Sequence, residues 1–215
     1  MIDYVFVFFL PGSAGNFFSR CLSLASNQAY GWIPEGSKIS ALSADEKYHV
    51  YSYAQSNQFN DWKKFEGKLV HYSTLFEHYA IPSDSISIWS EHPRYQLLDQ
   101  DLVGNSNQRQ VFYINPGDYF EWVVLNSLYK NSTIDVKWLS QGQQMLNDSA
   151  IHKINLANII AGADTLWLEV EKVYAIINHK CSNKELVQEL WKQWINTTLK
   201  PEQFAEFKSS IGFNI

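Results

Sequence analysis

The first 24 residues constrain the fold most strongly, because an apolar run there leads into a small-residue turn and then into a helical pattern. Residues 4–10 (YVFVFFL) are apolar and mostly β-branched or aromatic, which predicts a buried strand. Residues 11–16 (PGSAGN) carry turn chemistry, and residues 17–24 repeat apolar side chains at roughly helical spacing. A strand, a tight loop and a helix aim backbone N–H groups and a helix N-terminus at an anion. The segment therefore predicts a site for a phosphate-bearing ligand; the alternative is that its glycines only turn a strand into a helix.

The loop lacks the side chains of a nucleotide-hydrolysing phosphate loop. A Walker A motif places a lysine on the phosphates and a serine or threonine hydroxyl on magnesium. Here Gly12 and Gly15 are three residues apart, and Asn16 and Phe17 stand where those two side chains would be. Magnesium-dependent nucleotide hydrolysis therefore loses both of its key groups.

Composition limits the classes of protein that fit. A chain of 215 residues with 46% hydrophobic and 18% charged residues predicts one domain, residues 1–215, with a sizeable core. No apolar run approaches the length of a membrane span, and no basic segment precedes the first strand, so neither a span nor a signal peptide is expected. Cys21 and Cys181 have no metal-ligand spacing and suit thiols in a reducing cytoplasm. The net charge of −5 disfavours non-specific binding of nucleic acid.

Predicted strands alternate with predicted helices along the chain. Further strands are expected at 68–72, 84–89, 109–114 and 164–170. Helices are expected at 119–130 (with Phe120, Val123, Val124 and Leu128 on one face), 135–146, 149–160, 183–199 (with Leu186, Leu190, Trp194 and Ile195) and from Pro201 onward. Residues 27–66 are expected to be loop-rich, with aromatic residues that pack on something. The pattern predicts a three-layer α/β fold with a central, mainly parallel sheet flanked by helices.

Ligands of such sheets bind at the carboxyl ends of the strands. The segments that follow the predicted strands are 12–16, 71–74, 90–92, 115–118 and 169–171. His92 follows an apolar strand and precedes a proline, and a histidine that titrates near neutral pH suits proton abstraction from an acceptor hydroxyl. The alternative is that His92 caps a helix or lies in a surface turn. His71 fits a core or hydrogen-bonded histidine better, because its neighbours alternate in polarity.

Four segments, taken in order, resemble a known family. Residues 11–18 (PGSAGNFF) are similar to the loop that wraps the 5′-phosphosulfate in sulfotransferases, which belong to the P-loop folds. Residues 89–93 (WSEHP) resemble the strand end that carries the general base of the family, and residues 111–118 (VFYINPGD) resemble part of its 3′-phosphate site. Residues 166–171 (LWLEVE) resemble a late strand. The resemblance spans most of the chain, although each motif is short.

The resemblance implies a P-loop-type fold and transfer of a sulfuryl group from 3′-phosphoadenosine 5′-phosphosulfate, without a metal. It implies His92 as the catalytic base. The residues that it implies for cofactor binding are Gly12, Ser13, Ala14, Gly15, Asn16, Phe17, Ser19, Arg20 and Asn115. The acceptor would be the hydroxyl or amine of a small molecule or carbohydrate, bound by residues 27–66 and their aromatic side chains.

Several positions depart from the pattern of the family. Ser13 stands in place of a basic residue, Asn16 and Phe17 in place of two threonines, Ile114 in place of an arginine, and Trp122 near the place of a serine. We expect Arg20, Arg94 or Arg109 to supply the missing positive charge. Two alternatives stay open: a kinase-like protein that binds nucleotide or phosphate on the same fold, and a catalytically inactive member. The sequence indicates no oligomeric state.

Overall fold

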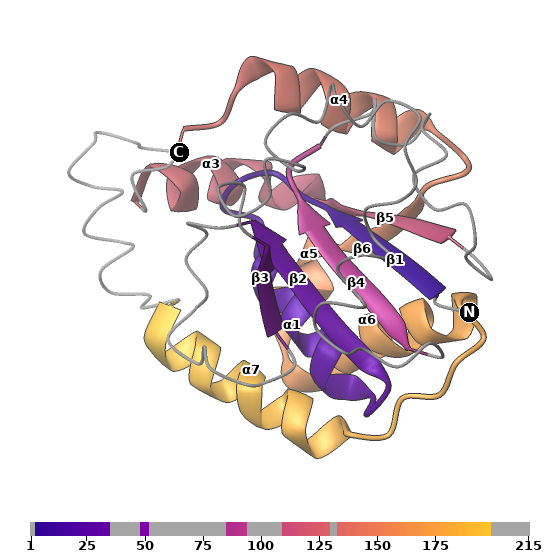
Figure 1. Cartoon of the computed structure of the whole chain (residues 1–215). Helices are drawn as coiled ribbons and strands as arrows, with labels where there is room; N and C mark the ends of the chain where they lie inside the picture. The colour runs from indigo at the N-terminus through magenta and orange to yellow at the C-terminus, as the bar shows by residue number, and fades with distance from the viewer. Residues whose placement is uncertain (1–2, 35–47, 52–84, 94–108, 130–132, 199–215) are drawn as a thin grey trace.

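A parallel sheet runs through the protein with β1 (Asp3–Phe8) in its interior (Figure 1). The computed structural model describes residues 3–34, 48–51, 85–93, 109–129 and 133–198. The other strands are β2 (Ala29–Pro34), β3 (Tyr48–Tyr51), β4 (Ile86–Glu91), β5 (Arg109–Asn115) and β6 (His152–Asn155). Their order across the sheet is β3-β2-β4-β1-β5-β6, and all five pairings are parallel. The carboxyl ends of all these strands therefore meet at one edge.

The side chains of the sheet alternate between two covered faces. Val5 and Val7 of β1, Ile88 of β4 and Phe112 of β5 belong to the buried cluster that includes residues of α1, α6 and α7. On the other face, the rings of Tyr4, Phe6 and Phe8 follow one another at centroid distances of 6.4 and 6.5 Å. Every residue of β1 is buried, as a parallel strand covered on both faces requires.

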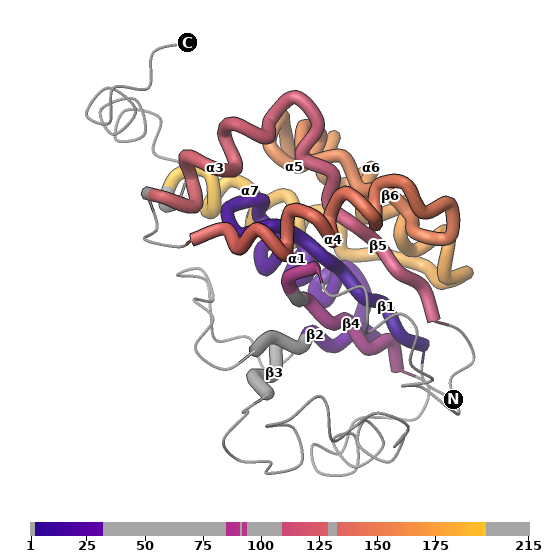
Figure 2. Tube along the Cα trace, turned by 90° about the horizontal axis from the view of Figure 1, so that it is seen from above, coloured from indigo at the N-terminus to yellow at the C-terminus, as the bar shows by residue number. Residues whose placement is uncertain are grey.

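Helices cover both faces and define a three-layer α/β fold, which confirms the predicted architecture. The helices are α1 (Gly15–Ala25), α3 (Phe120–Tyr129), α4 (Val136–Asn147), α5 (Leu156–Ala161), α6 (Ala163–Ile176) and α7 (Lys184–Thr198), and the short 3-10 helix η3 (Gly117–Tyr119) precedes α3. In Figure 2, α5, α6 and α7 lie together on one side of the strands. α4 packs on the other face, where Gly142 lies against the ring of Tyr113. No helix within the described ranges is long and apolar enough to cross a membrane.

Residues 164–170 form part of helix α6, so the strand predicted there is wrong. Leu166, Val170, Val173 and Tyr174 are buried at helical spacing, whereas Leu168, which an alternating strand would bury, is 61% exposed. The motif at 166–171 is therefore helical and does not follow a strand at the carboxyl edge.

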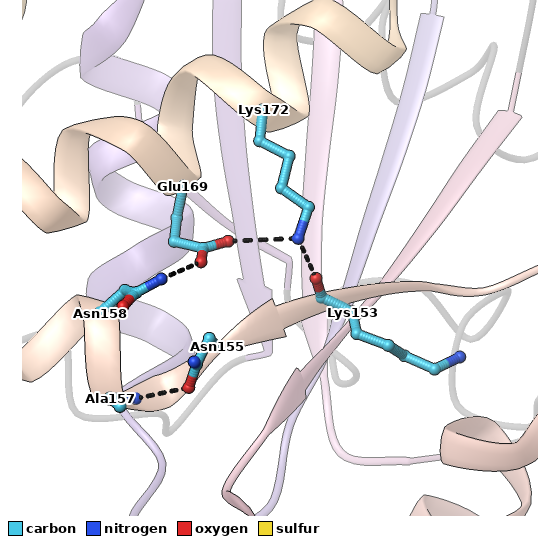
Figure 3. A network of polar contacts seen from close by, with 6 residues as sticks. All are labelled: Lys153, Asn155, Ala157, Asn158, Glu169 and Lys172. Atoms are coloured by element: carbon cyan, nitrogen blue, oxygen red, sulfur yellow. Dashed lines mark hydrogen bonds and ion pairs between the residues drawn. The ribbon is translucent and has the colours of Figure 1, made fainter.

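A polar network holds α6 against β6 and α5 (Figure 3). Asn158 Nδ2 donates to Glu169 Oε1 at 2.6 Å, and Lys172 Nζ lies 3.5 Å from Glu169 Oε2. Lys172 also donates to the backbone carbonyl of Lys153. A buried carboxylate is costly unless it is paired, and Glu169 is 5% exposed. Glu169 therefore serves the packing of this corner of the fold.

The last strand within the described residues is β6, inside the segment predicted as a helix at 149–160. Residues 152–155 pair in register with β5, and the helix begins only after Asn155, whose Oδ1 accepts a hydrogen bond from Ala157 N at 3.0 Å.

Within 27–66, expected to be loop-rich, residues 29–34 and 48–51 form β2 and β3. The strand predicted at 68–72, the helix from Pro201, His71 and Arg94 lie outside the described residues.

The buried faces of two predicted helices differ from expectation. In α3 the expected apolar face included Phe120 and Leu128, which are 43% and 46% exposed, while Val123 and Leu125 are buried. The reason is that α3 turns its backbone near residues 123–127 toward the loop after β1. In α7 Leu190 and Trp194 are buried as expected, but Leu186 is 50% exposed.

Candidate functional site

Three segments that the sequence singled out lie at the carboxyl edge of the sheet. β4 and β5 flank β1, and Phe8, the last residue of β1, is in register with Glu91 and Tyr113. The loops at residues 9–14, 92–93 and 116 therefore leave the sheet as neighbours. In the order β3-β2-β4-β1-β5-β6, the strands β2 and β3 lie on one side of β1 and the strands β5 and β6 on the other. The direction in which the sheet is extended therefore reverses beside β1, and open α/β sheets bind ligands at the carboxyl edge of such a switch point.

The loop after β1 begins with a type II turn over residues 10–13. Ser13 N donates to Leu10 O at 3.0 Å, and Gly12 has φ +88° at the third position of the turn. Proline at the second position and glycine at the third are the residues that a type II turn favours. The hydroxyl of Ser13 donates to the same Leu10 carbonyl at 2.5 Å. Both donors of Ser13 thus serve the turn, and Ser13 is fully buried.

Ala14 places the start of α1 in a conformation that gathers backbone N–H groups. It is the N-cap of α1, with φ 60° and ψ 22°, a left-handed conformation that is uncommon for a residue with a Cβ. A left-handed residue followed by a helical one turns successive N–H groups toward a common point, which favours anion binding. The first bond of this helix runs from Phe18 N to Ala14 O. The N–H groups of residues 14–17 therefore precede the helical ladder and form the donor set of the loop.

Close packing accounts for both glycines of the loop. A Cβ on Gly12 would lie 2.4 Å from Val123 O of α3, and a Cβ on Gly15 would lie 1.9 Å from the ring of Phe9. Contacts this short exclude any side chain without movement of the backbone or the ring. The glycines are thus required by the fold whether or not an anion binds.

The predicted side chains in α1 point mostly into the protein. The ring of Phe17 stacks on Trp194 of α7 at 4.0 Å and 10°, so Phe17 can offer a ligand only its N–H. Ser19 is fully buried, and its hydroxyl makes no hydrogen bond with the described part of the chain. Arg20 is the basic residue of α1 and is 6% exposed. Its predicted contact with a phosphate group stays a prediction.

Asn16 joins the loop to β4. Ser90, buried near the end of β4, donates its hydroxyl to Asn16 Oδ1 at 3.2 Å. The two residues are far apart in sequence, and this bond holds the first turn of α1 against the strand that leads to His92. Two of the motifs of the sequence analysis are thus in direct contact.

One hydrogen bond and the packing of two aromatic rings hold the side chain of His92 in place. Nδ1 lies 3.2 Å from the backbone oxygen of Phe9, and a carbonyl oxygen only accepts, so Nδ1 carries the proton. In the neutral ring Nε2 is then the basic nitrogen. The ring packs edge-on to Phe9 at 5.1 Å and against Trp138 of α4 at 4.3 Å. His92 is half-buried, oriented, and in the tautomer that a general base at Nε2 requires.

Asn115 lies at the end of β5, but its oxygen is engaged locally. Asn115 Oδ1 accepts from Gly117 N at 3.0 Å, which closes the turn into η3. Its amide NH₂ is the part that remains for the predicted contact with a cofactor. Arg109, expected as a substitute cation, is the first residue of β5, at the end of the strand away from the carboxyl edge. Its guanidinium lies 5.6 Å from the ring of Phe6, two residues before the end of β1, and its contact with an anion stays a prediction.

The two cysteines do not support a role as a catalytic nucleophile or as metal ligands. Cys21 is buried, and burial raises the pKa of its thiol, which keeps it protonated. Burial likewise raises the pKa of the Cys181 thiol, with Glu171 adding to the effect. Across the described ranges, no three side chains of His, Cys, Asp or Glu gather as a metal site would need.

The sequence reasoning missed three residues that shape this site. Phe9 packs on Gly15 and its backbone oxygen bonds to His92, the ring of Trp138 packs against the His92 ring, and Asn126 Nδ2 donates to Gly12 O at 2.6 Å. Their positions follow from strand order and helix docking, for which the sequence carries no local signal.

No protein-family model matches the chain, and no curated protein matches it either.

Proposed function

We propose that this protein is a sulfotransferase-type enzyme that moves a sulfuryl group from 3′-phosphoadenosine 5′-phosphosulfate to a hydroxyl or amine. The observation that carries the proposal is the meeting of an N–H-rich loop and an oriented histidine at one sheet edge. The loop reaches β4 through the bond between Asn16 and Ser90, and His92 reaches the start of the loop through Phe9. The proposal places the chain in the P-loop class, in which such a loop follows the first strand.

The backbone of the loop supplies the anion contacts in this proposal. The N–H groups of residues 14–17 and the positive end of the α1 dipole would hold the 5′-phosphosulfate. Ser13 contributes by closing the turn and not by donating to the ligand. Arg20 and the Asn115 amide would add contacts at the two charged ends of the donor.

His92 would act as the general base. The acceptor oxygen or nitrogen attacks sulfur in line, its proton passes to His92 Nε2, and the bond from sulfur to the bridging phosphate oxygen breaks. The leaving group is 3′-phosphoadenosine 5′-phosphate. The Nδ1–H bond to Phe9 O fixes the ring throughout and stabilises the imidazolium that forms. Both thiols are free, which is in keeping with a cytoplasmic enzyme.

A ligand screen tests the proposal directly. The unfolding temperature of the protein is measured with 3′-phosphoadenosine 5′-phosphate, with sulfate, and with ATP and magnesium. A hundredfold excess over the dissociation constant stabilises a folded protein by about 2.7 kcal/mol. We expect a shift with the first ligand and transfer of labelled sulfate from the activated donor to a panel of phenols and sugars. Stabilisation by ATP with magnesium alone would instead favour a kinase-like protein.

The packing of the glycines favours a second candidate, a non-catalytic member of the same fold. Because Gly12 and Gly15 are needed for contact with α3 and Phe9, the loop keeps its shape without any ligand. In this case none of the three ligands shifts the unfolding temperature. The screen therefore separates an enzyme from a protein that keeps only the fold.

A further inference from the structure

A side-chain amide from α3 reaches the backbone of the loop after β1. Asn126 is 2% exposed, and its Nδ2 donates to Gly12 O at 2.6 Å. The backbone of α3 approaches the same glycine so closely that a Cβ there would lie 3.0 Å from Ser127 N. The loop and the helix that follows β5 are thus in backbone contact, with Asn126 as their polar link.

The peptide unit between Gly12 and Ser13 is hydrogen-bonded at both of its polar ends. Ser13 N–H donates to Leu10 O, and Gly12 O accepts from Asn126. A trans peptide is planar and its N–H and C=O point in opposite directions. Two bonds on opposite sides therefore fix the rotation of this unit, and with it the direction in which the following N–H groups leave the loop.

We propose that Asn126 is a positioning residue, which keeps the Gly12 carbonyl turned to α3 so that the N–H groups of residues 14–17 face the anion. The inference rests on the proposed function for the identity of the ligand. A carbonyl oxygen that lost its donor would be buried without a partner, which proteins avoid. The unit would then rotate toward another donor, and an oxygen turned toward the anion would repel it.

The chain offers a matched control at the far end of α1. Asn183 Nδ2 donates to Leu24 O at 2.9 Å, again from a side-chain amide to a backbone carbonyl distant in sequence. Leu24 is near the carboxyl end of α1, away from the loop. Asn183 is half-buried and its Nδ2 also lies 3.3 Å from Asn27 Oδ1, so Asn183→Ala should lower stability through loss of the same kind of bond and leave the loop unchanged.

The experiment compares Asn126→Ala, Asn126→Gln and Asn183→Ala with the native protein in the full chain. Amide hydrogen exchange of Ser13, the ¹H–¹⁵N shifts of residues 14–17 and the dissociation constant of 3′-phosphoadenosine 5′-phosphate are measured. We expect Asn126→Ala to speed exchange at Ser13, to move those shifts, and to weaken binding about tenfold. Asn126→Gln keeps the amide donor and should recover most of the affinity.

Two results would overturn the inference. One is that Asn126→Ala and Asn183→Ala give the same Ser13 exchange, the same loop shifts and the same affinity. The other, should Asn126→Ala not fold, is an Asn126→Leu protein, which has nearly the same side-chain shape but no donor, with the Ser13 exchange and loop shifts of the native protein. If the native protein binds none of the ligand, the proposed function fails, while exchange at Ser13 and the loop shifts still decide whether Asn126 fixes the loop.

Discussion

The hydroxyl of Ser90 donates a 3.2 Å hydrogen bond to Asn16 Oδ1, which ties the carboxyl end of β4 to the first turn of α1. Asn16 therefore has two environments, a hydroxyl donor on one side and the positive end of a helix dipole on the other. A substitution at Asn16 that interacts more favourably with the helix dipole can therefore still weaken the binding of an anion at the same helix end.

Asn16→Asp should stabilise the protein and impair binding at the same time. The carboxylate keeps an acceptor for Ser90 and gains about 0.3–1 kcal/mol from the helix N-terminus. The same charge repels the phosphosulfate group, and like-charge contact should weaken binding about a hundredfold. Urea unfolding gives the stability, and titration with 3′-phosphoadenosine 5′-phosphate gives the affinity.

Asn16→Ala is the control for this prediction. It removes the bond with Ser90 without adding charge, so its affinity should lie between those of the native protein and Asn16→Asp. An Asp variant that binds as tightly as the native protein would rule out an anion at this helix end.

His92→Gln should lower sulfuryl transfer by about 10²–10⁴-fold, which is the usual contribution of a general base. Glutamine retains an N–H donor for Phe9 O but has no basic nitrogen, so the fold should be kept. His152→Gln is the matched control, since His152 also uses a ring nitrogen, at 3.0 Å from Gln110 Oε1, and belongs to β6. Equal turnover in the two variants, measured with labelled donor, would remove His92 from the mechanism.

Gly12→Ala should destabilise the protein far more than Gly117→Ala. Both glycines have positive φ, +88° and +50°, so both substitutions carry a backbone cost of about 1–2 kcal/mol. Only at Gly12 does the new Cβ meet backbone, 2.4 Å from Val123 O, whereas nothing lies within 4 Å of a Cβ on Gly117. The difference in free energy of unfolding should exceed about 1 kcal/mol, the low end of the cost of overpacking. Similar losses in the two variants would mean that α3 does not pack on the loop.

Elements with strong periodicity were predictable from the sequence. The apolar run of β1 and the helical spacing in α1 and α7 identify those elements, because burial imposes a period of two or 3.6 residues. The order of the strands has no such local signature, and the contact between Ser90 and Asn16 depends on it. The sequence could predict that the loops share an edge of a parallel sheet, but not that β4 and β5 flank β1.

The failures have specific causes. Residues 164–170 show apolar side chains at alternate positions, and only the continuation to Tyr174 reveals the helical period. β6 has four residues, of which Ile154 alone is buried, so no strand pattern is visible. The turn at residues 10–13 was readable as type II from Pro11 and Gly12. A type II turn explains Ser13 by itself, because both of its donors bond to Leu10 O, so Ser13 does not take the place of the basic residue of the sulfotransferase loop.

Stability should fall in mild acid through His152. Burial, with the nearby charges of Lys153 and Lys172, lowers the pKa of His152 below 6.5. The folded state therefore binds a proton less readily than the unfolded state, and the stabilising contribution is present above about pH 6.5. It is lost as the pH falls through the lower pKa of the folded protein. The free energy of unfolding in urea, measured between pH 7.5 and 5.0 in native protein and His152→Gln, should decline less in the variant; parallel curves would contradict this.

The stack of Phe17 on Trp194 should bear on stability and not on ligand binding. Trp194 is 2% exposed and docks α7 on α1 through this contact at 4.0 Å, so Trp194→Ala should cost about 3–5 kcal/mol. Leu186→Ala on the exposed side of the same helix should change stability by less than about 0.5 kcal/mol. Where Trp194→Leu remains folded, its affinity for 3′-phosphoadenosine 5′-phosphate should match that of the native protein, because Phe17 contributes only its backbone N–H to the loop. A large loss of affinity in a folded Trp194→Leu protein would instead show that the ring stack sets the position of the helix N-terminus.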